Sequence, residues 1–250
     1  MDYSKKKIII ADLDGTLSVS KNPVDVEMAG IIAMLLQKKA LAVISGGSYA
    51  QYQKQFLPSL PGNADFSRLY LFPTCATAFY RFNKGWEKIY SEVLSEEEKK
   101  RIFTAFDIAL RESNFDFQQP AYGDRVEDRT TQVTFSAYGQ WAPFEIKSKW
   151  DPDQRKRIVI VSALKRHIPE FDIRIGGTSS IDVTRKGIDK EYGIRKIMEH
   201  LGFKMEEMVF IGDALFEGGN DYPAKTMGLD CIQVSGPEDT KRILRDMIAK

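Results

Sequence analysis

The sequence predicts an α/β fold in which a parallel sheet is interrupted by a smaller α+β segment. Over residues 1–80, short apolar runs alternate with helical stretches, as a parallel sheet requires. From about residue 84, period-two alternation indicates half-exposed antiparallel strands. The first pattern returns near residue 186. A chain of 250 residues can hold one large or two small domains of this kind.

The core is expected to form from residues 1–83 and 186–250. Its strands are predicted where short apolar runs occur, at 8–11, 40–44, 69–73, 208–211 and 231–234. Its helices are predicted from amphipathic runs at 28–39, 189–201 and 238–248. Pro58–Gly62 ends the helix that follows the second strand. The segment 78–82 is expected to begin the crossing into the inserted part.

Residues 84–185 are expected to form the inserted α+β domain. Ser95 and Glu98 have the spacing of a capping box and predict a helix that runs to about residue 112. A second helix is predicted over 151–164, after an Asp-Pro-Asp start. Alternating polar and apolar residues predict strands at 116–119, 132–137 and 172–175. The result is an antiparallel sheet with two helices on one face.

The composition is that of a globular protein with no polyanionic partner. A formal net charge of +1 argues against nucleic acid or a membrane surface as partner. No apolar run approaches membrane-spanning length. A cleavable signal peptide would remove the first strand, so we expect a cytoplasmic protein. Lys5–Lys7 are interpreted as a solvated start to that strand, with a binding patch as the alternative.

Two carboxylates follow the first strand directly. Asp12 and Asp14 are succeeded by Gly15 and Thr16. Chemistry collects at the carboxyl ends of strands in open α/β sheets, and two neighbouring acids need a cation or a shared proton to coexist. The loop must curl for both to face one ligand, and Gly15 permits this. The alternative is a polar turn that only ends the strand.

Two further strand ends carry polar groups. Ser45 precedes Gly46 and Gly47, a pattern suited to binding an oxyanion through backbone N–H groups, although a plain strand-to-helix turn has the same composition. Asp213 ends a later apolar run and is a candidate metal ligand, with Asp221 nearby. An acidic surface loop is the alternative there. Three such strand ends in one chain favour a shared site.

This combination resembles the haloacid dehalogenase superfamily of phosphotransferases with an aspartate nucleophile. Residues 12–16 are similar to its first motif, Ser45 to its second, Lys190 to its third and residues 212–221 to its fourth. The long gap between the second and third motifs resembles the subclass with an inserted α+β cap. The resemblance implies a Rossmann-like parallel-sheet core, residues 1–83 and 186–250, with a specificity cap at 84–185.

Within the superfamily, the likeness is strongest to eukaryotic-type phosphomannomutases. The double glycine of residues 212–221 and the stretch 176–183 carry it. The resemblance implies that Asp12 attacks phosphorus and that Asp14 acts as general acid and base. It also implies one Mg²⁺ ion. The residues expected to bind or surround that ion are Asp12, Asp14 through its carbonyl, Asp213 and Asp221.

The resemblance also assigns substrate contacts. Ser45, Gly46 and Lys190 are expected to hold phosphate oxygens, with Lys186 as the alternative to Lys190. In the cap, the expected contacts are Arg129, Ser180 and Asp182. Family members dimerise through the cap, which leaves a homodimer open.

Two cap positions depart from the phosphomannomutase pattern. Tyr122 and Gln140 stand where the family has arginines, and fewer forked donors weaken phosphate binding. The sequence is therefore interpreted first as a Mg²⁺-dependent sugar-phosphate phosphatase. A phosphomannomutase-like mutase is the alternative, and a non-catalytic sugar-phosphate sensor is a third hypothesis.

Overall fold

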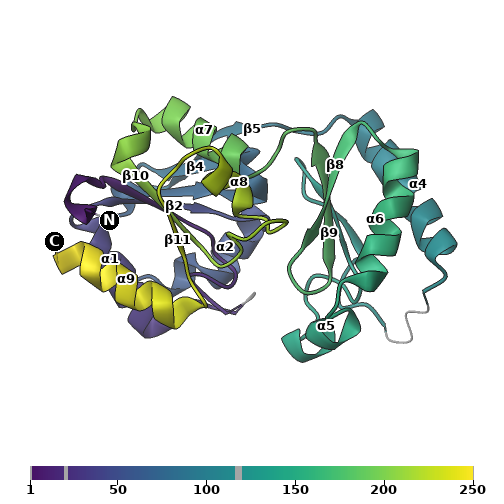
Figure 1. Cartoon of the computed structure of the whole chain (residues 1–250), viewed down its shortest axis with the longest axis horizontal. Coiled ribbons are helices and arrows are strands. Elements are labelled where there is room, and N and C mark those ends of the chain that lie inside the picture. The colour runs from purple at the N-terminus through teal and green to yellow at the C-terminus, as the bar shows by residue number, and fades with distance from the viewer. Residues whose placement is uncertain (1, 20–21, 116–119, 250) are drawn as a thin grey trace. The chain divides into compact units, whose positions relative to one another are not determined.

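The chain folds into two compact units. The computed structural model describes residues 2–19, 22–115 and 120–249. The core unit comprises Met1–Ser91 and Asp189–Lys250, and the cap unit comprises Glu92–Ile188 (Figure 1). The units are described separately below.

The core unit is a seven-stranded sheet of order β11-β10-β1-β2-β3-β4-β5. The strands are β1 (Ile8–Ala11), β2 (Ala40–Ile44), β3 (Leu69–Phe72), β4 (Ala78–Phe82), β5 (Trp86–Ser91), β10 (Met208–Gly212) and β11 (Cys231–Gln233). The helices are α1 (Val26–Leu36), α2 (Tyr49–Gln55), α3 (Pro73–Ala76), α7 (Lys190–Leu201), α8 (Tyr222–Thr226) and α9 (Pro237–Ala249). Strands β1, β2, β3, β10 and β11 run parallel, as predicted.

Helices cover both faces of this sheet because its central strands are apolar on both sides. Ile9 and Ala11 of β1 belong to the cluster built with α1, α2 and α9, while Ile8 and Ile10 belong to the cluster built with α3, α7 and α8. Figure 1 shows α1 and α9 lying together on one face. Full burial of an Ile side chain stabilises the fold by about 1.5–3 kcal/mol, so β1 anchors both layers.

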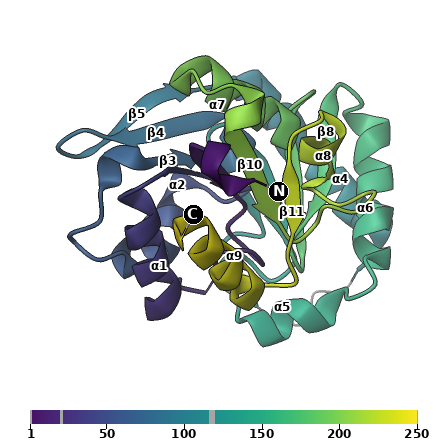
Figure 2. The ribbon, with the colours of Figure 1, turned by 60° about the vertical axis from the view of Figure 1, so that its left-hand side comes forward.

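The last two strands of the core correct one expectation. The segment 78–82 does not cross into the cap; it forms β4, which pairs antiparallel with β3 and with β5. Figure 2 shows β4 and β5 as a hairpin at the edge of the sheet. The turn closes because Lys84 adopts a left-handed φ of 57° and Asn83 donates to the Gly85 carbonyl at 2.8 Å. The core therefore continues to Ser91, past the expected limit of residue 83.

The cap unit is a four-stranded antiparallel sheet of order β6-β7-β9-β8. Its strands are β6 (Val126–Asp128), β7 (Val133–Ser136), β8 (Phe171–Gly176) and β9 (Ser180–Arg185), and its helices are α4 (Glu96–Ser113), α5 (Phe144–Trp150) and α6 (Arg155–His167). Val133 and Phe135 face the apolar cluster shared with α4 and α6. Thr134 and Ser136 alternate with them, so the other face of the sheet is polar.

The two main cap helices and two of its predicted strands are present, with shifted ends. The predicted strand at 116–119 lies outside the described residues. The short β6 and α5 were not predicted from composition, because three residues of strand and one and a half turns of helix carry little periodicity. No helix in the described part of the chain is long and apolar enough to cross a membrane.

The interpretation of Lys5–Lys7 as a solvated segment was wrong for Lys6. Its side chain is 5% exposed, and its ammonium group lies 2.6 Å from a carboxylate oxygen of Asp230. It also donates to the Glu206 carbonyl at 2.9 Å. A long lysine side chain can bury its stem while its charge is paired, so a run of lysines does not by itself indicate solvation.

The capping box of α4 gives a stability prediction. The Ser95 hydroxyl accepts from the Glu98 N–H at 3.1 Å, and the Glu98 carboxylate accepts from the Ser95 N–H at 2.7 Å. Ser95→Ala should lower the free energy of unfolding by about 1 kcal/mol, the usual cost of an N-cap. Thr104→Ala, in the same helix, is the matched control and should change it little, since the Thr104 hydroxyl only bonds the Lys100 carbonyl. Urea unfolding followed by circular dichroism measures both; equal losses would contradict the capping argument.

Candidate active site

The loop after β1 is wound tightly enough to turn its polar groups to one edge of the sheet. The Leu13 carbonyl accepts from the N–H groups of Leu17 and Ser18 at 3.0 Å each. Gly15 has a φ of +89°, a conformation that L-residues rarely adopt. The predicted curl of this loop is therefore present, and it depends on the glycine.

Lys190 connects the first and fourth motifs. Its ammonium group contacts the Asp12 carboxylate and lies 3.2 Å from Asp221. It also donates to the Ile44 carbonyl at 2.9 Å. The Lys190 side chain is 2% exposed, whereas Lys186 is exposed and belongs to the cap unit. The geometry thus favours Lys190 over Lys186 as the lysine of the site.

Lys190 is held at the start of α7. Asp189 caps this helix by accepting from the Tyr192 N–H at 2.9 Å, and the helix packs against the sheet through Ile194 and Ile197. Burial alone would lower the pKa of Lys190, but the charges of Asp12 and Asp221 outweigh it, and the pKa is raised. Lys190 is therefore a fixed positive charge at any physiological pH.

Asp221 is a buried residue that contacts Lys190 and the backbone of the fourth motif. It is fully buried, and its Oδ2 accepts from the Ala214 N–H at 3.1 Å. A Cβ at Gly212 would lie 2.3 Å from that same oxygen, so only glycine fits at the end of β10. Asp221 thus faces Lys190 and the backbone of the fourth motif, as expected for a residue that positions others.

Asp213 closes the site on the side of the first motif. Its Oδ1 accepts from the Thr16 hydroxyl at 3.2 Å, and its Oδ2 would lie 2.7 Å from a Cβ at Gly15. Burial raises its pKa, and the charge of Asp221 raises it further. The carboxylate therefore lies against the loop that follows Asp12.

The charge balance of this edge fits a divalent cation. Asp12, Asp213 and Asp221 are three carboxylates around one ammonium group, and burial raises the pKa of Asp12 well above its ordinary value. Among the residues described, no three His, Cys, Asp or Glu side chains converge as a metal cluster. Mg²⁺ needs only one or two carboxylates and keeps waters on its other positions. Asp12 and Asp213, with backbone oxygen of the first motif, are a donor set of that kind.

Asp14 is held by two glutamines that sequence reasoning missed. Gln55 donates to its Oδ1 at 2.8 Å, and Gln51 donates to its Oδ2 at 3.1 Å. Both amides are buried and lie one turn apart on α2. Gln51 also donates to Gln55 at 2.7 Å, which fixes the pair. The two glutamines are four residues apart in the segment that follows the second motif, and this spacing is the signal that could have indicated them.

The second motif forms a compact loop. The Ser45 hydroxyl accepts from the Gly47 N–H at 3.1 Å, and the Ser45 carbonyl accepts from the Cys75 N–H at 2.9 Å. Ser45 is buried, and Gly46 is half-buried. Because β1 and β2 are parallel neighbours, Ser45 and Asp12 follow adjacent strands at the same edge. The structure thus brings the predicted core residues of the four motifs to one edge of one sheet.

The predicted cap residues form polar networks within the cap unit. Arg129 contacts Glu127 at 2.9 Å and donates to Gln140 at 2.6 Å. Asp182 accepts from Thr134 at 2.7 Å, on the polar face of the cap sheet. Ser180 lies on the same strand, with its hydroxyl 3.3 Å from that of Ser136. Arg125 donates to the Ala137 carbonyl at 3.0 Å.

Gly15 provides a test of the loop geometry. Gly15→Ala should abolish measurable turnover, because the new Cβ would press on the Asp213 carboxylate in a backbone conformation already unfavourable to alanine. Gly30→Ala, in α1, is the control: nothing lies within 4 Å of its Cβ, and activity should be retained. Steady-state turnover of a sugar phosphate, with circular dichroism to check folding, measures both. Normal activity of the folded Gly15→Ala variant would contradict the placement of Asp213.

Comparison with known proteins agrees with this arrangement. The chain is 28% identical to a phosphomannomutase of Encephalitozoon cuniculi over an alignment of 265 positions, which covers 100% of this chain and 96% of that protein. It is 28% identical to the phosphomannomutase of Saccharomyces cerevisiae, covering 96% and 93%. Among solved structures, a haloacid dehalogenase-like hydrolase from Bacteroides thetaiotaomicron has the same fold, with a TM-score of 0.65 at 15% identity and coverage of 97% and 99%.

A second solved structure extends the comparison. The C-terminally truncated IMP-nucleotidase of Plasmodium falciparum matches with a TM-score of 0.73 at 18% identity, covering 99% of this chain and 72% of that one. The family model of eukaryotic phosphomannomutase matches residues 28–250, nearly the whole chain. The chain therefore belongs to the eukaryotic phosphomannomutase family, and its fold is that of a haloacid dehalogenase-like hydrolase.

Proposed function

We propose that the protein is a Mg²⁺-dependent phosphotransferase that acts on a hexose phosphate, as a mutase of the phosphomannomutase type. The observation that carries the proposal is the buried contact of Lys190 with Asp12, in a chain that aligns with phosphomannomutases over their full length. A carboxylate nucleophile needs such a fixed cation, because it must approach an anionic phosphoryl group.

Asp12 performs the first displacement. One oxygen of its carboxylate forms a bond to phosphorus while the bond between phosphorus and the sugar oxygen breaks. Asp14 donates a proton to the departing oxygen, and Gln51 and Gln55 hold its carboxyl group for that transfer. In the second step, the 6-hydroxyl of a hexose 1-phosphate attacks the aspartyl phosphate and gives its proton to Asp14, so both acids are restored and a hexose 1,6-bisphosphate forms. The bisphosphate then reverses its orientation and returns its 1-phosphoryl group to Asp12, which leaves the 6-phosphate.

The remaining residues of this edge hold the phosphoryl group. Lys190 acts as a point charge, and Ser45 with the N–H of Gly46 supplies neutral donors. Mg²⁺, when bound by Asp12 and Asp213, neutralises charge that would otherwise keep two anions apart. Asp221 positions Lys190 and the fourth motif. The cap unit is proposed to supply sugar contacts through Arg129, Ser180 and Asp182.

Hydrolysis is the second candidate, and a specific observation favours it. Gln140 lies at a position where the family has an arginine. Its side-chain oxygen accepts a hydrogen bond from Arg129, so this amide is engaged within the cap unit. Tyr122 likewise offers no forked cation. Loss of two guanidinium groups would weaken retention of a bisphosphate intermediate and let water compete for the aspartyl phosphate. The sequence alone favoured this outcome; the relatives favour the mutase.

The role of Asp12 can be tested by trapping. Asp12→Asn should lower turnover by at least about 10³-fold and prevent formation of a phosphorylated or beryllofluoride-bound enzyme, because an amide oxygen is a poor nucleophile. Mass spectrometry after rapid quenching detects the phosphoaspartate. Asp246→Asn, an exposed acid in α9, is the matched control and should leave turnover and trapping unchanged.

The requirement for Mg²⁺ can be tested with a chelator. Excess chelator should abolish turnover by the unmodified enzyme, and turnover in its presence would remove Mg²⁺ from the proposal.

Product analysis separates mutase from hydrolase. With a hexose 1-phosphate and catalytic hexose 1,6-bisphosphate, the 6-phosphate should accumulate faster than inorganic phosphate. Gln140→Arg should raise the ratio of the two products further, since it restores a forked donor. Arg129→Ala should raise KM for the sugar phosphate about tenfold and spare a small aryl phosphate, while Arg101→Ala, an exposed cap arginine, should change neither. Release of inorganic phosphate alone would replace the mutase with the phosphatase.

A further inference from the structure

A basic depression lies at the edge of the core sheet opposite to the candidate active site. It has a volume of about 370 Å³ and lies where β1, β2 and β3 begin. Its basic lining residues are Lys6, Lys7, Lys38, Lys39 and Arg68, and none of the described residues that line it is acidic. The first and second motifs follow the other ends of β1 and β2, the fourth follows β10, and none of the motif residues lines this depression, so the proposed reaction uses none of its lining.

Three of these five cations have carboxylate partners outside the lining. The pairs are Lys6 with Asp230 at 2.6 Å, Lys7 with Glu207 at 2.5 Å and Arg68 with Asp65 at 3.3 Å. These partners hold the side chains in place without filling the depression, because none of them lines it.

The other two cations donate only to backbone carbonyls among the described residues. Lys38 donates to Ile248 at 2.7 Å, and Lys39 donates to Tyr3 at 2.8 Å and to Lys6 at 2.7 Å. Burial lowers the pKa of Lys39, and the adjacent charge of Lys38 lowers it further. The charge of Asp2 acts in the opposite direction on Lys39 but does not outweigh these effects, so two neighbouring ammonium groups would gain from a further anion.

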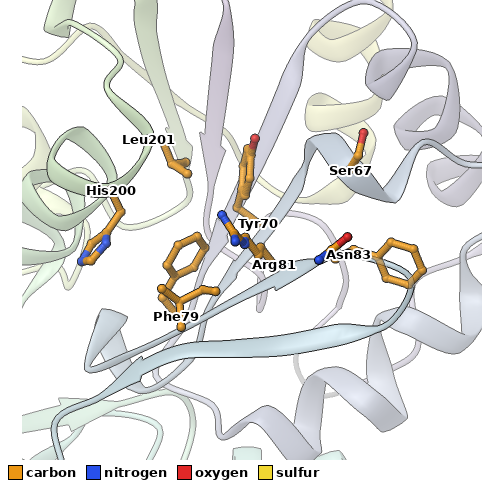
Figure 3. Close-up of a pocket in the computed structure, with 9 residues that line it drawn as sticks. Ser67, Tyr70, Phe79, Arg81, Asn83, His200 and Leu201 are labelled. Atoms are coloured by element: carbon orange, nitrogen blue, oxygen red, sulfur yellow. The ribbon is translucent and has the colours of Figure 1, made fainter.

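An aromatic depression of about 450 Å³ adjoins the basic one. Figure 3 shows side chains that line it, including Tyr70, Phe79, Arg81 and His200. The rings of Phe79 and His200 lie 5.7 Å apart, and Tyr70 lies 6.2 Å from Phe79. Aromatic rings and polar groups both line this depression, and both volumes are within the usual range of small-molecule sites.

Tyr70 joins the two depressions, because it lines both. It lies opposite Arg81 in the pairing of β3 with β4, so the two side chains share one face of the sheet. Burial raises the pKa of Tyr70, while the positive charges of Arg68 and Arg81 act to lower it. Arg68 lines the basic part and Arg81 the aromatic part.

We propose that this composite groove binds a nucleotide, with the phosphates against Lys38, Lys39 and Arg68 and the base against Tyr70 and His200, which lie over the buried ring of Phe79. The two parts together favour this ligand over simpler ones. A sugar phosphate would leave the aromatic part empty, and an apolar ring would leave the basic part empty. Base stacking and charge-assisted contacts would both contribute to binding of a nucleotide.

Equilibrium binding of ATP tests the proposal. It is measured by calorimetry on the Asp12→Asn variant in excess chelator, so that neither turnover nor metal at the catalytic edge contributes. Lys38→Gln and Arg81→Gln should each weaken ATP binding about tenfold, the equivalent of one charge-assisted contact. Tyr70→Leu should weaken it similarly if the variant folds. Lys165→Gln, an exposed cap lysine, is the matched control and should have no effect.

Pyrophosphate and adenosine distinguish the two parts of the groove. Each should bind at least tenfold more weakly than ATP, since each fills one part only. Pyrophosphate binding as tight as ATP, or adenosine binding as tight as ATP, would overturn the nucleotide proposal. So would ATP binding that the groove variants do not change, or no binding at all. The outcome is independent of the proposed mutase activity, which turnover of the unmodified enzyme tests.

Discussion

The candidate site depends on one buried ammonium group between two buried carboxylates. Lys190 contacts Asp12, at the end of β1, and Asp221, beyond the end of β10, although 178 residues separate the first pair. Removing one partner from a buried ion pair costs about 3–5 kcal/mol, because the remaining charge stays desolvated. The contact of Lys190 with Asp12, the proposed nucleophile, therefore also fixes α7 against the strands.

The parallel sheet is what makes this contact available. Its order places β1 between β10 and β2, so the first, second and fourth motifs follow three neighbouring strands. Two glycine residues let the backbone approach the carboxylates closely. Gly15 leaves room for Asp213, and Gly212 leaves room for Asp221. Asp14, the proposed general acid and base, is held instead by α2, through Gln51 and Gln55. Each carboxylate is thus oriented by a different element. The four acids therefore lie at one edge of the sheet but have different surroundings.

The sequence predicted the core far better than the contacts that tune it. Apolar runs located β1, β2, β3, β10 and β11 within one residue at each end, because buried parallel strands carry a strong local signal. The hairpin of β4 and β5 was missed, since edge strands are partly exposed and their pairing depends on tertiary packing. Gln51, Gln55 and the burial of Lys6 were missed for the same reason. A polar side chain has no periodicity that reveals its partner.

The cap has a hydrophobic core of its own, and the chain passes between the two units only at Ser91–Glu92 and Ile188–Asp189. An insertion of this kind can be exchanged without altering the sheet that holds the proposed nucleophile. Under the proposed function, evolution can then change the recognised sugar, or the competition between water and a second hydroxyl, through about a hundred residues that carry none of the proposed phosphoryl-transfer groups. Tyr122 and Gln140 lie in that exchangeable part. The residues proposed for the chemistry and those proposed for the choice of substrate therefore lie in separate units of the chain and can change independently.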